Sequence, residues 1–497
     1  REDLLGGLSL ERVFTTDGKN PYESLVWERR DVVIMDWKTG KPSYERKGVE
    51  VPAFWAENAL KITASKYLFG RDPETPEYED SLRHAFDRIA NTYTVWGWRH
   101  GYFATEADAL AYNHELKYLL AYQMWAPNSP VWFNIGHWEQ WRWGRPDLRK
   151  SMENRGNRAF KAILPEGDTD DRNLEVKEVS NAYIHPQASA CFLMGIEDSM
   201  EKILSHQIAE GGVFSSGSGI GVNLSTIRSS KEPIAGKGFA SGPISFDKGF
   251  DRMAGAIKSG GKTRRAARMV LLFADHPDIF QFISTKNQQE DIGKIVLREH
   301  NVSVALKKKA EAFAMKGSPA ERMAARIVLD MPMVTDRLYD AGMDDLLYGE
   351  TLGHQNANHS VSLKGDFWKA YQTKGEYATR WVSDPTKVED TFKAESILDA
   401  IAECVWHNAE PGTHNNDFIN IWNPVKADGD ISTSNPCSEY LHLDFTSCNL
   451  SSFNVFRFYD RDAKRMKVEQ LQKAIRIAMI AADLNIEEGG FPVPEIA

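Results

Sequence analysis

Short apolar runs alternate with segments of helical periodicity throughout the chain after Tyr183, and this alternation constrains the fold more than any other feature. Met269 to Phe273 is an uninterrupted apolar run, which predicts a buried strand. Asp275 then has the residue type of a helix N-cap, and Pro277 is favoured early in a helix. Further helices are expected near 198–210, 246–258, 306–315, 319–327, 395–409 and 467–485. Strands that alternate with helices in this way predict an α/β fold.

The chain before Tyr183 is organised differently. Two β-rich runs, at 32–35 and 49–51, lie on either side of a turn signal at Thr39-Gly40-Lys41 and predict a small sheet. Apolar residues at helical spacing then predict helices near 55–69, 79–93 and 106–124. The following charged stretch, rich in Trp and Arg, has weak periodicity, which is typical of a surface insertion. We therefore expect three parts: a small sheet with a helical domain at 1–136, an insertion or linker at 137–182, and an α/β unit at 183–497.

Charge and cysteine content exclude several classes of protein. The 60 basic and 70 acidic residues give a net charge of −10, which provides no field to attract nucleic acid. Four cysteines are too few for a disulfide framework, so we expect a reducing compartment, the cytoplasm by default. No apolar stretch approaches the length of a membrane span, and the Arg1-Glu2-Asp3 start does not resemble a signal peptide. Both ends look cut, so we expect a fragment of a longer protein without a membrane or nucleic-acid partner.

Two glycine-rich segments suggest nucleotide-binding loops, but neither has the spacing that such a loop needs. Gly217-Ser218-Gly219-Ile220-Gly221 is spaced G-x-G-x-G, so a glycine-rich turn is favoured over a dinucleotide site. Gly260-Gly261-Lys262-Thr263 resembles the end of a phosphate-binding loop, but the required earlier glycine is replaced by Ala256. The predicted helix also precedes this second segment, so its N-terminal amides would not face a phosphate. A P-loop NTPase is therefore the weakest of the functional alternatives.

The segment SNPCSEY at 434–440 combines three reactive residue types. If it is extended, Asn435, Cys437 and Glu439 project from one side, because side chains alternate along a strand. A neighbouring carboxylate disfavours the thiolate, so we expect Cys437 to stay protonated. A neutral thiol suits hydrogen-atom chemistry better than ionic attack. The segment therefore predicts a pocket wall made of an amide, a thiol and a carboxylate.

The remaining cysteines extend this prediction. Cys448 follows Cys437 by eleven residues and Cys191 lies far upstream, so three of the four cysteines could meet in one site. The alternative for each is a small buried hydrophobe, which is our interpretation of Cys404 in the predicted 395–409 helix. His407 and His414 lack two further ligands at fixed spacing, so the sequence predicts no metal-binding residues.

Eight ordered blocks resemble one enzyme family, the adenosylcobalamin-dependent (class II) ribonucleotide reductases in their long bacterial form. These blocks run over nearly the whole chain. They are NPYESLVWERRDVVI at 20–34, APNSPVWFN at 126–134, HPQASACF at 185–192, GSGIGVNLSTIR at 217–228, AGAIKSGGKTRRAA at 254–267, HPDIFQFI at 276–283, QNANHSVSL at 355–363 and SNPCSEYLHLDFTSCNLSSFN at 434–454.

The resemblance implies a ten-stranded α/β barrel, only part of which is in this chain, with a finger loop that carries Cys437 as the thiyl-radical residue. It implies adenosylcobalamin, a cobalt cofactor, as the source of that radical. Glu439 would be the general base on the 3′ hydroxyl of a ribonucleotide, and Asn435 would bind the ribose hydroxyls. Cys191 and Cys448 would supply the reducing electrons and close to a disulfide. Ser129 and Ala190 would join Asn435 and Glu439 in binding the substrate, which we expect to be a diphosphate.

The resemblance also implies allosteric control. Asp198, Ser199 and Arg228 match the pocket for a deoxynucleotide or ATP effector, although Asp198 could equally cap a helix and Arg228 could be a surface charge. Lys286 to Ile292, with Lys286 and Gln288 as effector contacts, match the loop that relays effector identity to the substrate site. Further expected partners are a second copy of the chain and a thioredoxin-like or dithiol reductant.

The sequence departs from the family pattern in two respects, and two alternative functions remain open. The Asp-x-His-x-x-Gly pattern that marks cobalamin held by a protein histidine is absent, so cofactor contacts are not assigned. The later barrel strands and the cysteine-bearing tail of the family lie outside these 497 residues. The nearest alternative is a class I large subunit, which a partner protein would radicalise. A second alternative is a non-catalytic half-enzyme that keeps only the effector pocket.

Overall fold

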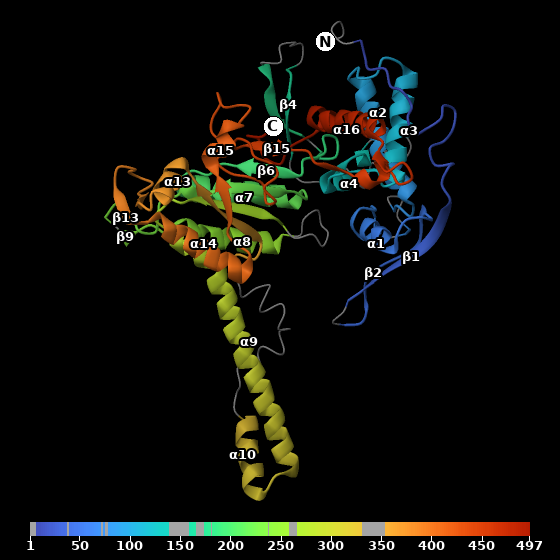
Figure 1. Cartoon of the computed structure of the whole chain (residues 1–497). Helices are drawn as coiled ribbons and strands as arrows, with labels where there is room; N and C mark the ends of the chain where they lie inside the picture. The colour runs from blue at the N-terminus through green and yellow to red at the C-terminus, as the bar shows by residue number, and fades with distance from the viewer. Residues whose placement is uncertain are drawn as a thin grey trace.

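A computed structural model gives the fold of the chain (Figure 1). It describes residues 6–36, 39–70, 73–74, 78–138, 159–165, 173–179, 181–236, 238–257, 266–330 and 353–497. The glycine-rich segment at 260–263 and most of the predicted insertion lie outside these described residues. In the described part of the insertion, β4 (Phe160–Ile163) and β5 (Glu175–Glu178) form an antiparallel hairpin.

The small sheet and the helices predicted near the start of the chain are confirmed. Strands β1 (Trp27–Met35) and β2 (Pro42–Pro52) pair antiparallel. Helices follow at α1 (Glu57–Lys66), α2 (Leu82–Arg99), α3 (Glu106–Ala121) and α4 (Ser129–Asn134). The first turns of α2, α3 and α4 are capped by the side chains of Ser81, Thr105 and Asn128, each of which accepts a backbone N–H.

The last helix of the chain packs into this N-terminal core. Helix α16 (Val468–Glu488) lies beside α2 and α3 in Figure 1. Its buried residues, among them Ile477 and Leu484, belong to the same hydrophobic cluster as Phe86 and Leu116 of the early helices. The hydroxyl of Tyr93 also donates a hydrogen bond to Asn485 Oδ1 (2.8 Å). Segments nearly four hundred residues apart in sequence therefore share one core.

A six-stranded sheet forms the centre of the second half. Its order is β14 (Gly412–Asn415), β11 (Ala357–Leu363), β10 (Arg268–Phe273), β7 (Gly219–Asn223), β6 (Cys191–Met194) and β15 (Thr446–Cys448). The first five strands in this order are parallel to one another, and β15 pairs antiparallel with β6. The apolar run at 269–273 is the buried strand that the sequence predicts, and the mixed α/β content is confirmed.

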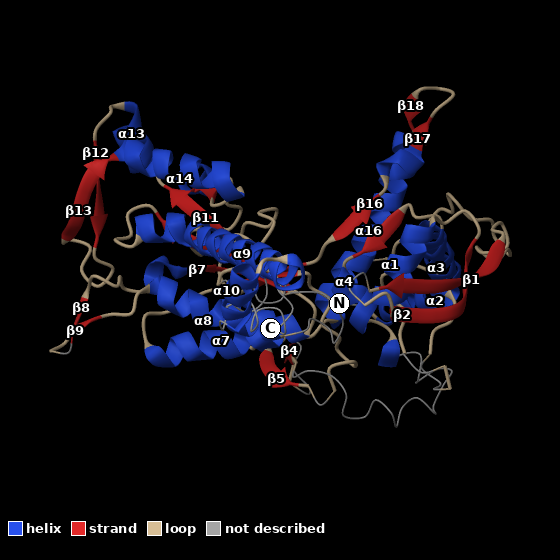
Figure 2. Ribbon diagram, turned by 90° about the horizontal axis from the view of Figure 1, so that it is seen from below, coloured by secondary structure: helices blue, strands red, loops and turns tan. Residues whose placement is uncertain are grey.

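Helices connect these strands (Figure 2). They are α7 (Met200–Ser215), α8 (Pro243–Ala256), α9 (Ile279–Lys316), α10 (Pro319–Asp330), α13 (Gly365–Gln372), α14 (Ala394–Asn408) and α15 (Asn416–Ile421). Of these, α7, α8, the start of α9, α13 and α14 pack on one face of the sheet. Strand residues such as Val222, Val270 and Val361 form a second core with residues from these helices. Because side chains alternate along a strand, their neighbours Gly221, Met269 and Ser360 face the other side. We call that other side the inner face.

Helix α9 corrects three expectations. It runs unbroken for 38 residues, about 57 Å at about 1.5 Å per residue, and it projects with α10 from the body in Figure 1. The predicted loop at 286–292 and the predicted separate helix at 306–315 both lie within it. The helix also begins at Ile279, and Asp275 is not its cap. The Asp275 carboxylate instead accepts a hydrogen bond from Lys364 Nζ (3.0 Å), a long-range contact that the local sequence does not reveal.

Short elements complete the described structure. Two-stranded pairs are β3 (Trp125–Pro127) with β16 (Ser451–Phe453), β8 (Pro233–Ile234) with β9 (Gly238–Phe239), β12 (Glu376–Arg380) with β13 (Val388–Lys393), and β17 (Tyr459–Asp460) with β18 (Arg465–Met466). Single 3₁₀ turns are η2 (Leu224–Thr226) and η4 (Val455–Phe458). Among the described residues, no helix has the length and apolar character needed to cross a membrane.

Candidate active site on the inner face of the sheet

The segment at 431–440 crosses the inner face of the sheet at very close range. A Cβ atom at Gly221 would lie only 1.9 Å from the backbone oxygen of Ser434. A Cβ at Gly219 would lie 3.2 Å from Pro436 Cγ, and the Asn223 side chain donates a hydrogen bond to Ser432 O (3.2 Å). Gly219 and Gly221 therefore lie in β7 and make room for this crossing segment, whereas Gly217 lies in the turn before the strand and has a positive φ of 96°. The predicted turn is therefore present at Gly217, and the two later glycines belong to a strand that follows a helix, not to a dinucleotide loop.

The tip of the crossing segment is a tight turn, which corrects the expectation of an extended strand. The Ser438 N–H donates to Asn435 O (3.0 Å), and Ser438 has a positive φ of 62°. The Asn435 N–H donates to Tyr440 O (3.2 Å), so the chain folds back on itself. The turn separates the side chains that strand alternation would have placed together. Asn435 is buried, whereas Cys437 and Glu439 are exposed.

Two cysteines meet beside this turn. Cys191, the first residue of β6, lies directly opposite Cys448, the last residue of β15. Both are free thiols, with Cys191 buried and Cys448 partly buried. The hydrogen bond between the two thiols, followed by burial, raises the pKa of Cys448 far above its ordinary value. The nearby Glu439 carboxylate acts in the same direction, so Cys448 is held in the protonated form.

Asn435 connects the turn to this pair. Its Nδ2 donates a hydrogen bond to Cys191 Sγ (3.1 Å), and its Oδ1 accepts one from the Tyr440 N–H (2.9 Å). The hydroxyl of Tyr440 in turn donates to Ser447 O (3.1 Å), next to Cys448. The structure therefore brings Asn435, Cys191 and Cys448 into one polar cluster, with Cys437 and Glu439 exposed on the same turn.

Ser129 and Ala190 lie on the segments that lead into this cluster. Ser129 is the first residue of α4, and its hydroxyl lies 3.1 Å from the hydroxyl of Tyr67. The start of α4 is held by Asn128, whose Nδ2 donates to Ala188 O (3.0 Å). Ala190 comes immediately before Cys191, and its N–H donates to Cys448 O (2.8 Å).

The predicted effector residues fall into two groups. Arg228 Nε pairs with Asp198 Oδ2 at 2.5 Å, and Ser199 caps α7 by accepting from the Lys202 N–H. Lys286 and Gln288, by contrast, project from α9. Lys286 pairs with Glu410 (2.7 Å), and Gln288 donates to Ser284 Oγ within the same helix (2.9 Å).

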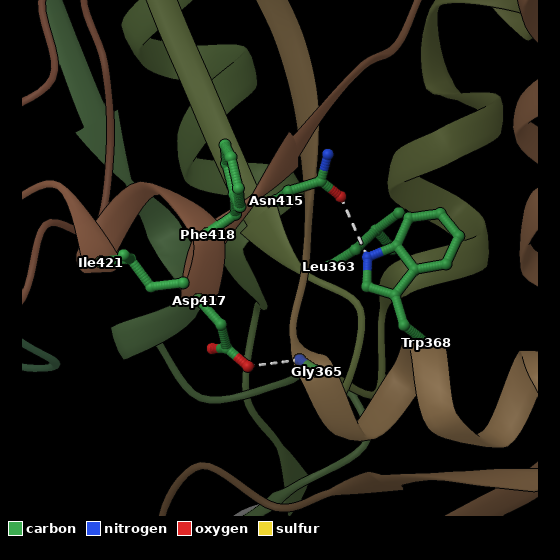
Figure 3. A pocket seen from close by; sticks show the side chains of 7 residues that line it. All are labelled: Leu363, Gly365, Trp368, Asn415, Asp417, Phe418 and Ile421. Atoms are coloured by element: carbon green, nitrogen blue, oxygen red, sulfur yellow. Dashed lines mark hydrogen bonds between the residues drawn. The ribbon is translucent and has the colours of Figure 1, made fainter.

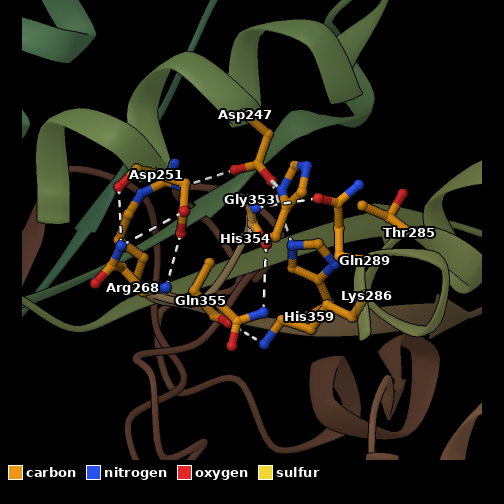
Figure 4. A network of polar contacts seen from close by, with 12 residues as sticks. Asp247, Asp251, Arg268, Thr285, Lys286, Gln289, Gly353, His354, Gln355 and His359 are labelled. Carbon is orange, nitrogen blue, oxygen red and sulfur yellow. Dashed lines mark hydrogen bonds and ion pairs between the residues drawn. The ribbon is translucent and has the colours of Figure 1, made fainter. Parts of the chain in front are cut away.

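Sequence reasoning missed two features outside the cysteine cluster. One is an apolar groove beyond the carboxyl ends of β11 and β14, lined by Leu363, Gly365, Trp368, Asn415, Asp417, Phe418 and Ile421 (Figure 3). The other is a buried cluster of Asp247, His354 and His359 (Figure 4). No sequence spacing signals this cluster, because His354 and His359 lie more than a hundred residues from Asp247. Of the two histidines considered as metal ligands, His407 and His414, the Nε2 of His414 lies 3.3 Å from Ser438 Oγ at the turn.

Comparisons with known proteins relate the chain to one enzyme family. Residues 189–497 match the family described as "Ribonucleotide reductase, barrel domain", and residues 29–123 match "Class II vitamin B12-dependent ribonucleotide reductase". The vitamin B12-dependent ribonucleotide reductase of Streptomyces coelicolor is 38% identical over 493 residues, which cover 99% of this chain and 42% of that protein. The enzyme of the same name from Rhodopirellula baltica is 35% identical, with the same shares covered.

The name of a third relative specifies its substrate. The Thermoplasma acidophilum protein, named vitamin B12-dependent ribonucleoside-diphosphate reductase, is 32% identical over 312 residues, which cover 62% of this chain and 32% of that protein. The chain thus spans less than half the length of these relatives. The matches extend over both the N-terminal segment and the sheet that carries the cysteines. The chain therefore belongs to the vitamin B12-dependent, class II ribonucleotide reductases.

Proposed function

We propose that this chain carries the thiyl-radical and dithiol site of an enzyme that reduces ribonucleoside diphosphates to 2′-deoxyribonucleotides. The observation that carries the proposal is the cluster of Asn435, Cys191 and Cys448 beside the exposed Cys437. Two adjacent thiols can release two electrons and two protons as they close to a disulfide. Replacement of a ribose 2′ hydroxyl by hydrogen needs that number of each.

Each residue of the site has a separate role in the proposed reaction. A thiyl radical on Cys437 removes the 3′ hydrogen of the ribose, while Glu439 accepts the proton of the 3′ hydroxyl. One thiol of the Cys191 and Cys448 pair protonates the leaving 2′ hydroxyl, which departs as water. The pair then delivers a hydrogen to the 2′ carbon and closes to a disulfide, which supplies the two electrons, and Glu439 returns its proton to the 3′ oxygen. The hydrogen then returns to the 3′ carbon from Cys437, which becomes a radical again. Asn435 binds the ribose hydroxyls. Its Nδ2, which now donates a hydrogen bond to Cys191 Sγ, would donate to the substrate instead.

The cofactor of the family is adenosylcobalamin, and the exposure of Cys437 fits it. When bound, this group supplies the one-electron chemistry that turns the thiol into a radical. An exposed sulfur at the tip of a turn can be reached by a bulky group, whereas the buried Cys191 cannot. The match to vitamin B12-dependent enzymes favours this proposal over a class I large subunit.

The remaining assignments belong to the same proposal. Ser129 and Ala190 contribute to substrate binding, and the narrower name of the Thermoplasma relative supports a diphosphate. Asp198, Ser199 and Arg228 bind a deoxynucleotide or ATP effector, with Lys286 and Gln288 as further contacts. We also propose a homodimer, a thioredoxin-like or dithiol reductant and the cytoplasm, because the four free thiols suit a reducing compartment. The proposed barrel has ten strands, preceded by a helical domain at 1–136 and the insertion at 137–182.

Anaerobic turnover of cytidine diphosphate tests the proposal. The assay contains dithiothreitol and a deoxynucleotide effector, with and without adenosylcobalamin. Deoxycytidine diphosphate that forms only with the cofactor supports the proposal. Product formed without it, on addition of a radical-generating partner protein, would identify a class I subunit instead. Effector binding without product under either condition would favour the half-enzyme.

A further inference from the structure

Three polar side chains converge in one buried cluster (Figure 4). They lie on the helix-covered face of the sheet, which is the face opposite the cysteine site. Asp247 comes from α8, His359 from β11 and His354 from the segment just before β11. Asp247 Oδ2 lies 2.7 Å from His354 Nδ1 and 3.2 Å from His359 Nε2. All three side chains are at most 3% exposed, and their donor atoms lie within 4.8 Å of one another.

The surrounding charges leave one carboxylate oxygen to the two histidines. Arg268 Nη1 donates to the other oxygen, Asp247 Oδ1 (2.6 Å), and Arg268 Nε pairs with Glu210. Glu210 thus offsets the charge of Arg268, which is itself fully buried. Lys286 is the other cation near the ring of His359, and it pairs with Glu410. Among the described residues, Asp247 Oδ2 therefore has its polar contacts with the two imidazoles.

We propose that Asp247, His354 and His359 bind one divalent transition-metal cation of the Zn²⁺ type, with water as the fourth ligand. Two imidazole nitrogens and one carboxylate oxygen suit Zn²⁺, whereas Mg²⁺ and Ca²⁺ prefer oxygen ligands. Tetrahedral ligands at about 2.0–2.2 Å from Zn²⁺ lie roughly 3.3 Å apart. The contact from His359 already has this spacing, and the shorter contact from His354 would open by roughly half an ångström. The ion would tie α8 to the start of β11.

Metal content and thermal stability test this site without any measure of turnover. The purified protein is stripped with a chelator and titrated with Zn²⁺, and bound metal per chain is counted by mass spectrometry. We expect one Zn²⁺ per chain and a rise in Tm, because a ligand that binds only the folded state stabilises it. Co²⁺ in the same site should give the visible absorption of a tetrahedral ion with nitrogen and oxygen ligands.

Two conservative variants locate the ion. His359→Gln keeps a hydrogen-bond donor without an imidazole, and His354→Asn does the same at a backbone φ of 62°, which asparagine tolerates. Both should lose the bound metal and the rise in Tm, whereas the exposed control His84→Gln should keep both. If the parent protein binds no Zn²⁺ and gives no Co²⁺ spectrum, the cluster is a hydrogen-bond network only. If both variants keep the metal, it lies elsewhere and the proposal is wrong.

Discussion

Cys191 and Cys448 lie directly opposite each other on antiparallel strands, although more than two hundred and fifty residues separate them in sequence. Their thiols are hydrogen bonded to each other, and Asn435 donates a further hydrogen bond to Cys191 Sγ. The proposed electron source therefore lies beside Asn435, on the same turn as the exposed Cys437.

Cys448→Ser should stop multiple turnover, because a single thiol cannot close to an intramolecular disulfide. We expect at least a hundredfold loss of steady-state deoxynucleotide formation. Cys404→Ser is the matched control, since Cys404 is buried in α14 among apolar residues, and it should retain most of the activity. Steady turnover by Cys448→Ser would remove this residue from the reducing pair.

Cys437→Ser should abolish product formation while effector affinity stays unchanged. Serine keeps the size of the side chain, but its O–H bond is too strong to take the place of the thiol in hydrogen-atom transfer. Product assays and equilibrium binding of a radiolabelled deoxynucleotide would measure the two effects separately. Appreciable deoxynucleotide formation by this variant would exclude Cys437 as the radical residue.

Gly221→Ala should displace the segment at 431–440, since the added Cβ would lie 1.9 Å from Ser434 O. Overpacking of this kind costs about 1–3 kcal/mol, and turnover should fall with stability. Gly249→Ala in α8 is the control, because a Cβ there meets nothing within 4 Å. Alanine at that exposed helical position should stabilise by up to about 1 kcal/mol. Equal denaturation midpoints for the two variants would contradict the close crossing.

Alkylation rates should distinguish the thiols. Iodoacetamide reacts with the thiolate, so a raised pKa lowers the rate at every pH below that pKa. Cys437 is exposed and should be modified first. An ordinary thiol, with a pKa of about 8.5, is mostly ionised by pH 10. The pKa of Cys448 is far higher, so its modification should remain slow at pH 10 and still increase with pH. Peptide mass spectrometry would follow each site, and a rate for Cys448 that levels off below pH 10 would refute the thiol–thiol hydrogen bond.

Much of the secondary structure was predictable because its signals are local. The apolar run at 269–273 forms a strand, and the helices expected near 79–93, 106–124 and 467–485 are present as α2, α3 and α16. The turn at Asn435 was not predictable from alternation, because contacts with β7 and β14 decide its path. The Asp247 cluster gave no signal, since its members lie on separate segments.

The amino-acid sequence alone determined the α/β character, the positions of most helices and the motifs that identify the family. Periodicity and short-range residue preferences decide these properties, and both act within a few residues. Only the tertiary structure decided which cysteines meet, which face of the sheet they share and that Asn435 faces inward while Cys437 faces outward. Those outcomes depend on strand register and on the close approach that Gly221 permits. Both arise from packing between segments that are far apart in the chain, and local sequence patterns do not encode such packing.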